Sequence, residues 1–129
     1  MLPMPDARVS LRNCVARWLP VGLTLPLGSA LPHETEMAAV ALGRTAWVTI
    51  PGELQSELGE LVKRGGAEAW ERVLIAGVSN DYLGYFLTAK DAAKPSYVAC
   101  ASLYGPGAGH RVARAAVGLL RLLADGPSR

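Results

Sequence analysis

The residues best suited to chemistry are a glutamate that follows a Pro-Gly break and a group of tyrosines further along the chain. Glu53 comes directly after Pro51-Gly52, between a hydrophobic run and a helical pattern, which is a common place for site residues in α/β folds. A tyrosine oxygen can bind a metal, and its hydroxyl can hydrogen-bond a developing oxyanion. The chain has four tyrosines, and they fall close together: Tyr82, Tyr85, Tyr97 and Tyr104. Simpler roles stay open, because a first-turn acid stabilises a helix and tyrosines also pack in cores.

Neither histidine stands in a recognisable catalytic motif. His33 lies in a short polar cluster that is typical of an exposed turn, although such a cluster could bind metal. His110 opens a helical pattern after a glycine-rich stretch that could accept an anion at the helix start. That stretch matches neither a Walker loop nor a dinucleotide fingerprint, and the chain has no Gly-x-Ser-x-Gly or His-Glu-x-x-His motif.

The composition is that of a folded domain. The chain has 129 residues, of which 50% are hydrophobic and 19% are charged, and this is enough for one domain with a modest core. The formal net charge is +2, and the arginines are scattered rather than aligned along one helix with interleaved aromatics. We therefore predict no nucleic-acid partner.

The two cysteines and one apolar run bear on export. Cys14 and Cys100 form no CxxC pair, so we favour two buried small hydrophobic residues, with a single disulfide as the alternative in an exported protein. The run from Trp18 to Pro32 contains three prolines and is too short to span a bilayer. Arg12 and Arg17 precede it as in a signal peptide, but the prolines and the long leader count against that interpretation.

The hydrophobic periodicity predicts a mixed α/β (α+β) fold, with a small mixed sheet and two main helices. Two β-prone runs, Met37–Leu42 and Thr45–Ile50, are separated by Gly43-Arg44, which predicts a hairpin. Apolar residues at helical spacing predict the two helices, and a β-rich run predicts a buried strand. These three elements are a helix at Glu53–Arg64, a strand at Arg72–Val78 and a helix at His110–Ala124 that Gly126-Pro127 ends.

The rest of the chain gives weaker patterns. We expect residues 1–34 to be a poorly defined N-terminal segment and residues 35–129 to form the domain. Four further elements are predicted from local composition: a short helix within Val9–Leu19, a strand at Val21–Leu25, a loop at Lys90–Pro95 and a strand at Tyr97–Leu103.

Three segments in this order resemble the neutral/alkaline, non-lysosomal ceramidase family. Thr45–Glu53 runs through a hydrophobic strand into Pro-Gly-Glu, and Asn80–Thr88 has the form Asn-x-Tyr-x-x-Tyr-x-x-Thr. Tyr97–Pro106 then closes on Ser-Leu-Tyr-Gly-Pro. Each segment is weak alone, but their order and spacing match the C-terminal part of that family's catalytic domain, from about Thr35 onward.

The resemblance implies a zinc-dependent amidohydrolase that splits ceramide into sphingosine and a fatty acid. It implies that Glu53 and Tyr85 are zinc ligands and that Tyr97 is a catalytic residue near the tetrahedral oxyanion. A ceramide-like lipid would be the substrate. Such chemistry is coherent, because zinc activates a bound water and a tyrosine hydroxyl stabilises the oxyanion.

The sequence also departs from the family. Lys90-Asp91-Ala92 and Val98 stand where the family usually has Glu-Glu-Tyr and Glu. The family's two zinc histidines and its active-site serine belong to segments that precede this region, and His33 and His110 match neither histidine. Two ligands alone make a poor catalytic zinc site.

Three interpretations follow from these departures. The chain is part of a catalytic domain, completed by a partner chain or in a homo-oligomer. Alternatively, it is a degenerate, non-catalytic scaffold, or it recruits His33 or His110 to the metal. Members of the family are often secreted or membrane-associated, and the sequence itself assigns no compartment.

Overall fold

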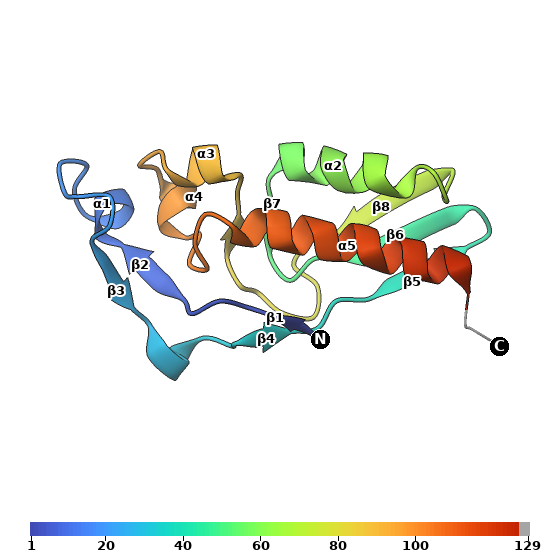
Figure 1. Ribbon diagram of the computed structural model, residues 1–129, viewed down its shortest axis with the longest axis horizontal. Coiled ribbons are helices and arrows are strands. Elements are labelled where there is room, and N and C mark those ends of the chain that lie inside the picture. Colours follow the sequence, from blue (N-terminus) through green and yellow to red (C-terminus); the bar gives the residue numbers. More distant parts are fainter. Residues whose placement is uncertain (127–129) are drawn as a thin grey trace.

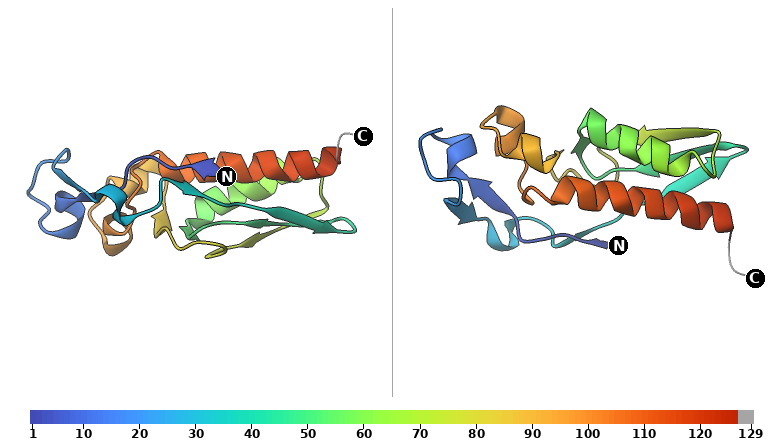
Figure 2. Two further views of the ribbon diagram at one scale, coloured as in Figure 1. Left: turned by 90° about the horizontal axis from the view of Figure 1, so that it is seen from below. Right: turned by 45° about the horizontal axis from the view of Figure 1, so that its top comes forward.

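The computed structural model describes residues 1–126 and has a mixed α/β fold, as the sequence predicts. Its central unit is a three-stranded sheet of β5 (Ala39–Leu42), β6 (Thr45–Thr49) and β8 (Arg72–Ala76). Two helices, α2 (Ser56–Gly66) and α5 (Ala108–Asp125), pack against each other and against one side of this sheet (Figures 1 and 2). The predicted small mixed sheet with two main helices is therefore confirmed.

The sheet joins an antiparallel hairpin to a parallel crossover. β5 and β6 pair antiparallel, with Leu42 opposite Thr45, so Gly43-Arg44 forms the predicted two-residue turn. Gly43 has a φ of +61°, a conformation that glycine adopts without steric cost. β6 and β8 pair in parallel through α2, which is the usual way to connect parallel neighbours.

The core lies between the two helices and one face of the sheet. Alternate residues of β6 and its continuation point into it, and Ala46, Val48 and Ile50 have no exposed surface. The apolar stripe of α5 supplies Val112, Ala116 and Leu120, and that of α2 supplies Leu58 and Val62. Burial of this size is the main favourable term in folding.

The predicted helix at Glu53–Arg64 begins later than expected, because its first residues belong to a strand. Glu53–Leu54 forms β7, and α2 starts at Ser56. The backbone N–H of Glu53 donates to the Gly84 carbonyl at 2.9 Å. This long-range pairing holds Glu53 outside the helix, so its placement in a first helical turn is wrong.

The helix predicted at His110–Ala124 is confirmed and slightly longer. It runs from Ala108 to Asp125, and Gly126 follows with a φ of +71°. Pro127, the other residue of the predicted stop, lies outside the described residues.

The N-terminal part forms short paired strands rather than the predicted helix. β1 (Leu2–Pro3) pairs with β4 (Glu34–Thr35), and β2 (Arg8–Ser10) pairs with β3 (Thr24–Pro26). The helix predicted within Val9–Leu19 shrinks to α1 (Leu11–Cys14), which begins at an N-cap on Ser10, and a single 3-10 turn, η1, spans Gly28–Ala30. The predicted boundary near residue 34 stays a prediction.

A disulfide joins this part to the other side of the chain. Cys14 and Cys100 are bonded, with their Cα atoms 4.8 Å apart. The favoured interpretation of two free buried cysteines is therefore wrong, and the alternative of a single disulfide is what the structure has. No helix within residues 1–126 is long and apolar enough to cross a membrane.

Two predicted elements near the disulfide are also wrong. The loop expected at Lys90–Pro95 contains α3 (Ala89–Ala92), and the strand expected at Tyr97–Leu103 begins instead with α4 (Tyr97–Cys100). Side-chain caps explain both, because the hydroxyls of Thr88 and Ser96 accept the N–H groups that start each helix. At Tyr97–Cys100 the cap overrides the β propensity of the residues that follow.

Candidate functional site

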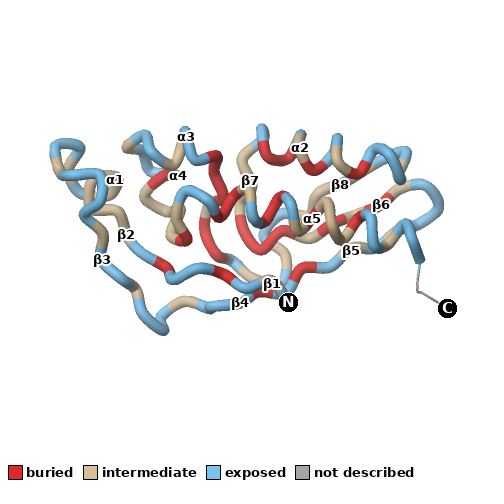
Figure 3. The backbone as a smooth tube through the Cα atoms, viewed as in Figure 1, coloured by how far each residue is buried: buried red, intermediate tan, exposed pale blue. Residues whose placement is uncertain are grey.

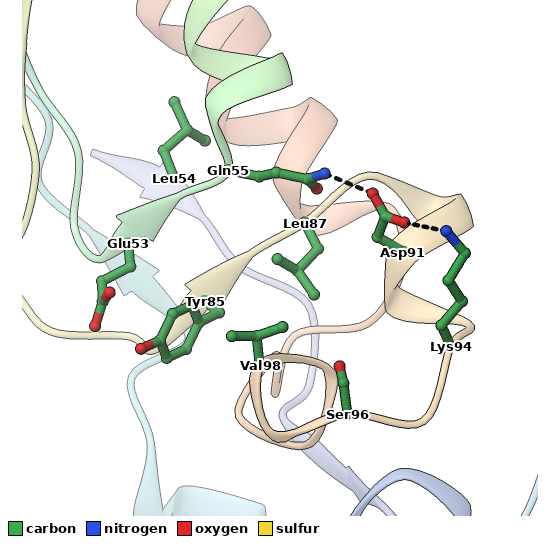
Figure 4. A pocket seen from close by; sticks show the side chains of 9 residues that line it. All are labelled: Glu53, Leu54, Gln55, Tyr85, Leu87, Asp91, Lys94, Ser96 and Val98. Atoms are coloured by element: carbon green, nitrogen blue, oxygen red, sulfur yellow. Dashed lines mark hydrogen bonds and ion pairs between the residues drawn. The ribbon is translucent and has the colours of Figure 1, made fainter.

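Glu53 and Tyr85 face each other on two short parallel strands. β7 (Glu53–Leu54) pairs with β9 (Tyr85–Phe86), and Glu53 lies directly opposite Tyr85. Figure 4 shows the carboxylate and the phenol on the same side of this pair. The structure thus brings together the two residues that the resemblance implies as metal ligands, although it does not test that role.

Gly52 allows these strands to come close, and Gly84 allows the second of them to lie against Ala101. A Cβ on Gly52 would collide with the Gly84 carbonyl oxygen, and a Cβ on Gly84 would collide with that of Ala101. Gly84 also has a φ of +80°, which a residue with a side chain adopts only with strain. The glycine of the Pro-Gly motif, Gly52, is therefore a requirement of the backbone beside Glu53.

Three of the tyrosines gather around Glu53. The Tyr82 hydroxyl donates a hydrogen bond to Oε1 of Glu53 at 3.0 Å. Hydrogen bonding to this carboxylate is the largest cause that raises the pKa of Tyr82 and of Tyr85 above the usual value of a phenol, because it stabilises the protonated form. Burial and repulsion of the phenolate by the carboxylate raise the pKa further. The Tyr97 ring meets that of Tyr85 edge to face, with centroids 6.0 Å apart and planes at 77°.

The fourth tyrosine belongs to the core. Tyr104 is buried, and its hydroxyl donates to the Pro32 carbonyl at 3.0 Å. Burial raises its pKa. By contrast, the Tyr97 side chain is 78% exposed on α4, so it stands at the rim of the site and is free to approach a bound molecule.

A pocket of about 410 Å³ opens beside Glu53 and Tyr85. One wall is apolar, and it is made by Leu54, Leu87 and Val98. The rest of the lining includes polar side chains that sequence analysis did not assign to a site (Figure 4): Gln55, Asp91, Lys94 and Ser96. Such a pocket suits a ligand that is mostly apolar and has a polar group at one end.

Asp91 is the centre of the polar side of the pocket. It accepts hydrogen bonds from Lys94 Nζ at 2.6 Å, from Gln55 Nε2 and from Thr88 Oγ1. Together these donors lower the pKa of Asp91 from 3.8 to about 2, with Lys94 as the largest cause. The Thr-x-x-Asp spacing of Thr88 and Asp91 is a capping signal in the sequence, which marks the start of α3 but does not place Asp91 in a pocket.

The described residues do not by themselves supply the ligands of a catalytic zinc site. Glu53 offers a carboxylate, and the neighbouring tyrosines offer phenol oxygens. His33 is exposed and lies 3.6 Å from Asp6, while His110 is in the first turn of α5. Among the described residues no group of three or more His, Cys, Asp or Glu could hold a metal. Because catalytic zinc usually takes three protein ligands and a water, this donor set is incomplete on its own.

The fold and the site together define a mixed α/β segment with a carboxylate and tyrosines at the mouth of an amphipathic pocket. This fold is that of part of neutral ceramidase. The chain matches the structure of neutral ceramidase from Pseudomonas aeruginosa with a TM-score of 0.62 and 22% identity, over 87% of this chain and 17% of that chain. It matches a ceramidase complexed with C2 with a TM-score of 0.60 and 21% identity, over 87% of this chain and 16% of that chain.

The chain thus spans about one sixth of the length of the ceramidases it matches. No protein-family model and no curated protein sequence matches it.

Proposed function

We propose that this chain forms the carboxylate-and-tyrosine side of a ceramidase-like, zinc-dependent amidohydrolase site, which histidines from elsewhere complete. The reaction would be hydrolysis of the amide bond of a ceramide-like lipid to sphingosine and a fatty acid. The observation that carries the proposal is the parallel pairing of Glu53 with Tyr85 within a ceramidase fold.

The geometry supports distinct roles for the three residues. Glu53 and Tyr85 would be metal ligands, since their oxygens lie on the same side of one strand pair. A bound zinc ion supplies an activated water and polarises the substrate carbonyl. Tyr97, exposed and in edge contact with Tyr85, would donate its hydroxyl proton in a hydrogen bond to the oxyanion.

The pocket supports a lipid amide as the substrate class. Leu54, Leu87 and Val98 give it an apolar wall next to the carboxylate. An acyl chain would lie against this wall, while the hydroxyls of a sphingoid base would meet the polar side formed by Asp91 and Lys94.

The outer face of the sheet supports a partner chain or a second copy. Register places Val40, Trp47 and Leu74 side by side on the face away from the helices. Val40 is 62% exposed, and Leu74 is 44% exposed. Both outer strands of the sheet, β5 and β8, also have an edge without a strand neighbour in the described part of the chain, and such features favour association.

Zinc binding tests the proposal directly. Zinc affinity would be measured on the purified chain by competition with a chromophoric chelator, and stoichiometry by native mass spectrometry. We expect weak binding, and we expect Glu53→Gln and Tyr85→Phe each to weaken it about tenfold. Glu57→Gln is the matched control, because Glu57 is an exposed glutamate in the first turn of α2.

The same experiment decides between catalysis and scaffolding. The incomplete donor set and the presence of Val98 in the pocket wall favour a second candidate, a non-catalytic ceramidase-like scaffold or interaction module. Equal zinc affinity in all four proteins would contradict the metal-site proposal and support the scaffold. Loss restricted to the Glu53 and Tyr85 variants would support the site, and a fluorogenic ceramide assay would follow.

A further inference from the structure

The end of the molecule formed by β2, α1 and β3 exposes large apolar side chains that the candidate site does not use. We call residues 15–25 the apolar tip. Its five exposed large hydrophobic residues have exposed fractions from 43% to 84%: Val15, Trp18, Val21, Leu23 and Leu25. Figure 3 shows the tube at this end mostly in the colour of exposed residues. A patch of this kind marks an interaction surface.

The charge around the apolar tip has a single sign. From Ala7 to His33 the chain has three arginines, Arg8, Arg12 and Arg17, and no aspartate or glutamate. None of the three forms an ion pair within residues 1–126. Two acids face this region from adjoining elements. Asp6 lies 3.6 Å from His33 and lines the hollow beside the tip, and Asp91 is bound by Lys94 and Gln55.

The apolar tip is held in shape by bonds of its own. The Leu11 N–H donates to the Leu23 carbonyl at 3.0 Å, and Arg12 Nε donates to the Arg17 carbonyl at 3.2 Å. The disulfide of Cys14 fastens α1 to α4. Because the loop is ordered in advance, docking of its side chains costs little conformational entropy.

A polar hollow adjoins the apolar tip. Its volume is about 270 Å³, and its polar lining beside Val21 has two arginines and one carboxylate: Arg8, Arg12 and Asp6, with Ser10 and Asn13. Guanidinium groups bind phosphate oxygens with good geometry. The hollow therefore offers a place for an anionic headgroup next to side chains that prefer an apolar medium.

We propose that the apolar tip docks on an anionic lipid bilayer. Trp18 and its aliphatic neighbours enter the boundary between headgroups and acyl chains, where tryptophan is favoured. Arg8, Arg12 and Arg17 meet the lipid phosphates, which attract basic segments close to the surface.

Docking at this end also places the candidate site near the membrane. α1 packs against α4, and α4 carries Tyr97 and Val98 of that site. The proposal nevertheless stands apart from the proposed hydrolase activity, because it requires neither zinc nor a substrate.

Vesicle flotation tests the docking. The purified chain would be mixed with vesicles of phosphatidylcholine alone or with added phosphatidylglycerol. We expect flotation with the anionic vesicles, weakened by salt, and about a tenfold weaker partition for Trp18→Ser, since a large apolar side chain is lost from the bilayer. Leu122→Ser is the matched control, because Leu122 is 68% exposed on α5 at the other end of the molecule.

The charge and the point of contact are tested separately. Arg17→Gln should weaken binding to anionic vesicles, whereas Arg114→Gln, an exposed arginine on α5, should leave it unchanged. Brominated lipids should quench tryptophan fluorescence in the wild type. That quenching should be lost in Trp18→Phe, which keeps an aromatic residue at the tip.

Three results would overturn the proposal. The first is a wild type that floats with neither kind of vesicle. The second is a folded Trp18→Ser variant that floats as well as Leu122→Ser. The third is a sizing experiment in which the wild type is a dimer, Trp18→Ser is a monomer and no vesicle binds, which would make the apolar tip a protein contact.

Discussion

The two ends of the molecule are stabilised in different ways. At the helix–sheet end, formed by α2, α5 and the three-stranded sheet, whole rows of side chains are buried. At the disulfide end, formed by β2, β3, α1, α3 and α4, only Ala99 is buried among the helical residues. There, caps, backbone hydrogen bonds and one covalent bond hold the chain. A repeated apolar pattern in the sequence therefore determines the structure of the helix–sheet end. Helix caps, backbone hydrogen bonds and the disulfide determine the structure of the disulfide end.

Removal of the disulfide should have the largest effect. Cys14 and Cys100 are separated by 86 positions, and in the chain-entropy model a cross-link that closes so long a loop contributes about 4.6 kcal/mol of stability. The double variant Cys14→Ala/Cys100→Ala should lose stability in urea unfolding followed by circular dichroism.

Hydrogen exchange would show where that loss falls. In the double variant, the amides of α1 and α4 should exchange faster, while those in the middle of α5 should stay protected until global unfolding. An equal increase in exchange rate in α5 and in α1 and α4 would contradict the view that the two ends are stabilised in different ways.

Truncation of a core residue should come next. Leu120 has no exposed surface, and its carbonyl accepts the Trp70 indole N–H at 2.9 Å. Leu120→Ala should cost about 3 kcal/mol, because it removes buried methyl groups and leaves a cavity.

An exposed leucine on the same helix provides the control for that loss. Leu122 is 68% exposed, so Leu122→Ala should change the free energy of unfolding by less than about 0.5 kcal/mol. A similar loss in both variants would show that α5 is not held by its buried stripe.

A smaller effect is expected where the loop after β8 is strained. Val78 has a φ of 52°, which is unfavourable for a β-branched residue. It is also 54% exposed, so little burial is lost on replacement. Val78→Gly should raise the free energy of unfolding by about 0.5–1 kcal/mol.

Asn80 in the same loop is the matched control. It too has a positive φ, of 71°, but asparagine tolerates this conformation. Asn80→Gly should therefore bring no gain, and a gain at Asn80 equal to that at Val78 would argue against backbone strain as the cause.

The smallest effect is expected in the pH dependence of stability that Asp91 causes. The folded pKa of Asp91 is lowered from 3.8 to about 2, so its bonds stabilise the fold fully above the ordinary pKa. That contribution is lost as the pH falls from about 4 to about 2. Asp91→Asn should be less stable than the wild type at neutral pH, and the difference should disappear at the acid end of this range in thermal melts. A difference that stays constant with pH would contradict the ionic role of Asp91.

The contrast between the helix–sheet end and the disulfide end also explains which parts of the fold could be predicted from the sequence. The hairpin around Gly43-Arg44 and the helix α5 follow from local periodicity, because burial on one face imposes that pattern. Glu53 was assigned to a helix because no local signal reveals its bond to Gly84. The pairing of Cys14 with Cys100 joins distant positions, and composition alone could not decide between thiols and a bond.

The candidate site was found in part. Glu53 and Tyr85 were singled out by motif, and the structure places them opposite each other. Their roles as ligands and that of Tyr97 stay predictions. Gln55 and Asp91 were missed, because their position in the pocket depends on how α3 meets the start of α2, and this contact joins segments far apart in the chain.

The disulfide also divides the chain topologically. The bond closes a covalent ring that contains Glu53, Tyr85 and Tyr97, while α5 lies outside the ring and packs onto it from the C-terminal side. A single proteolytic nick inside the ring would leave the two halves of the candidate site tethered. A cut between positions 101 and 107 would instead break the covalent link to α5, the helix that covers the core.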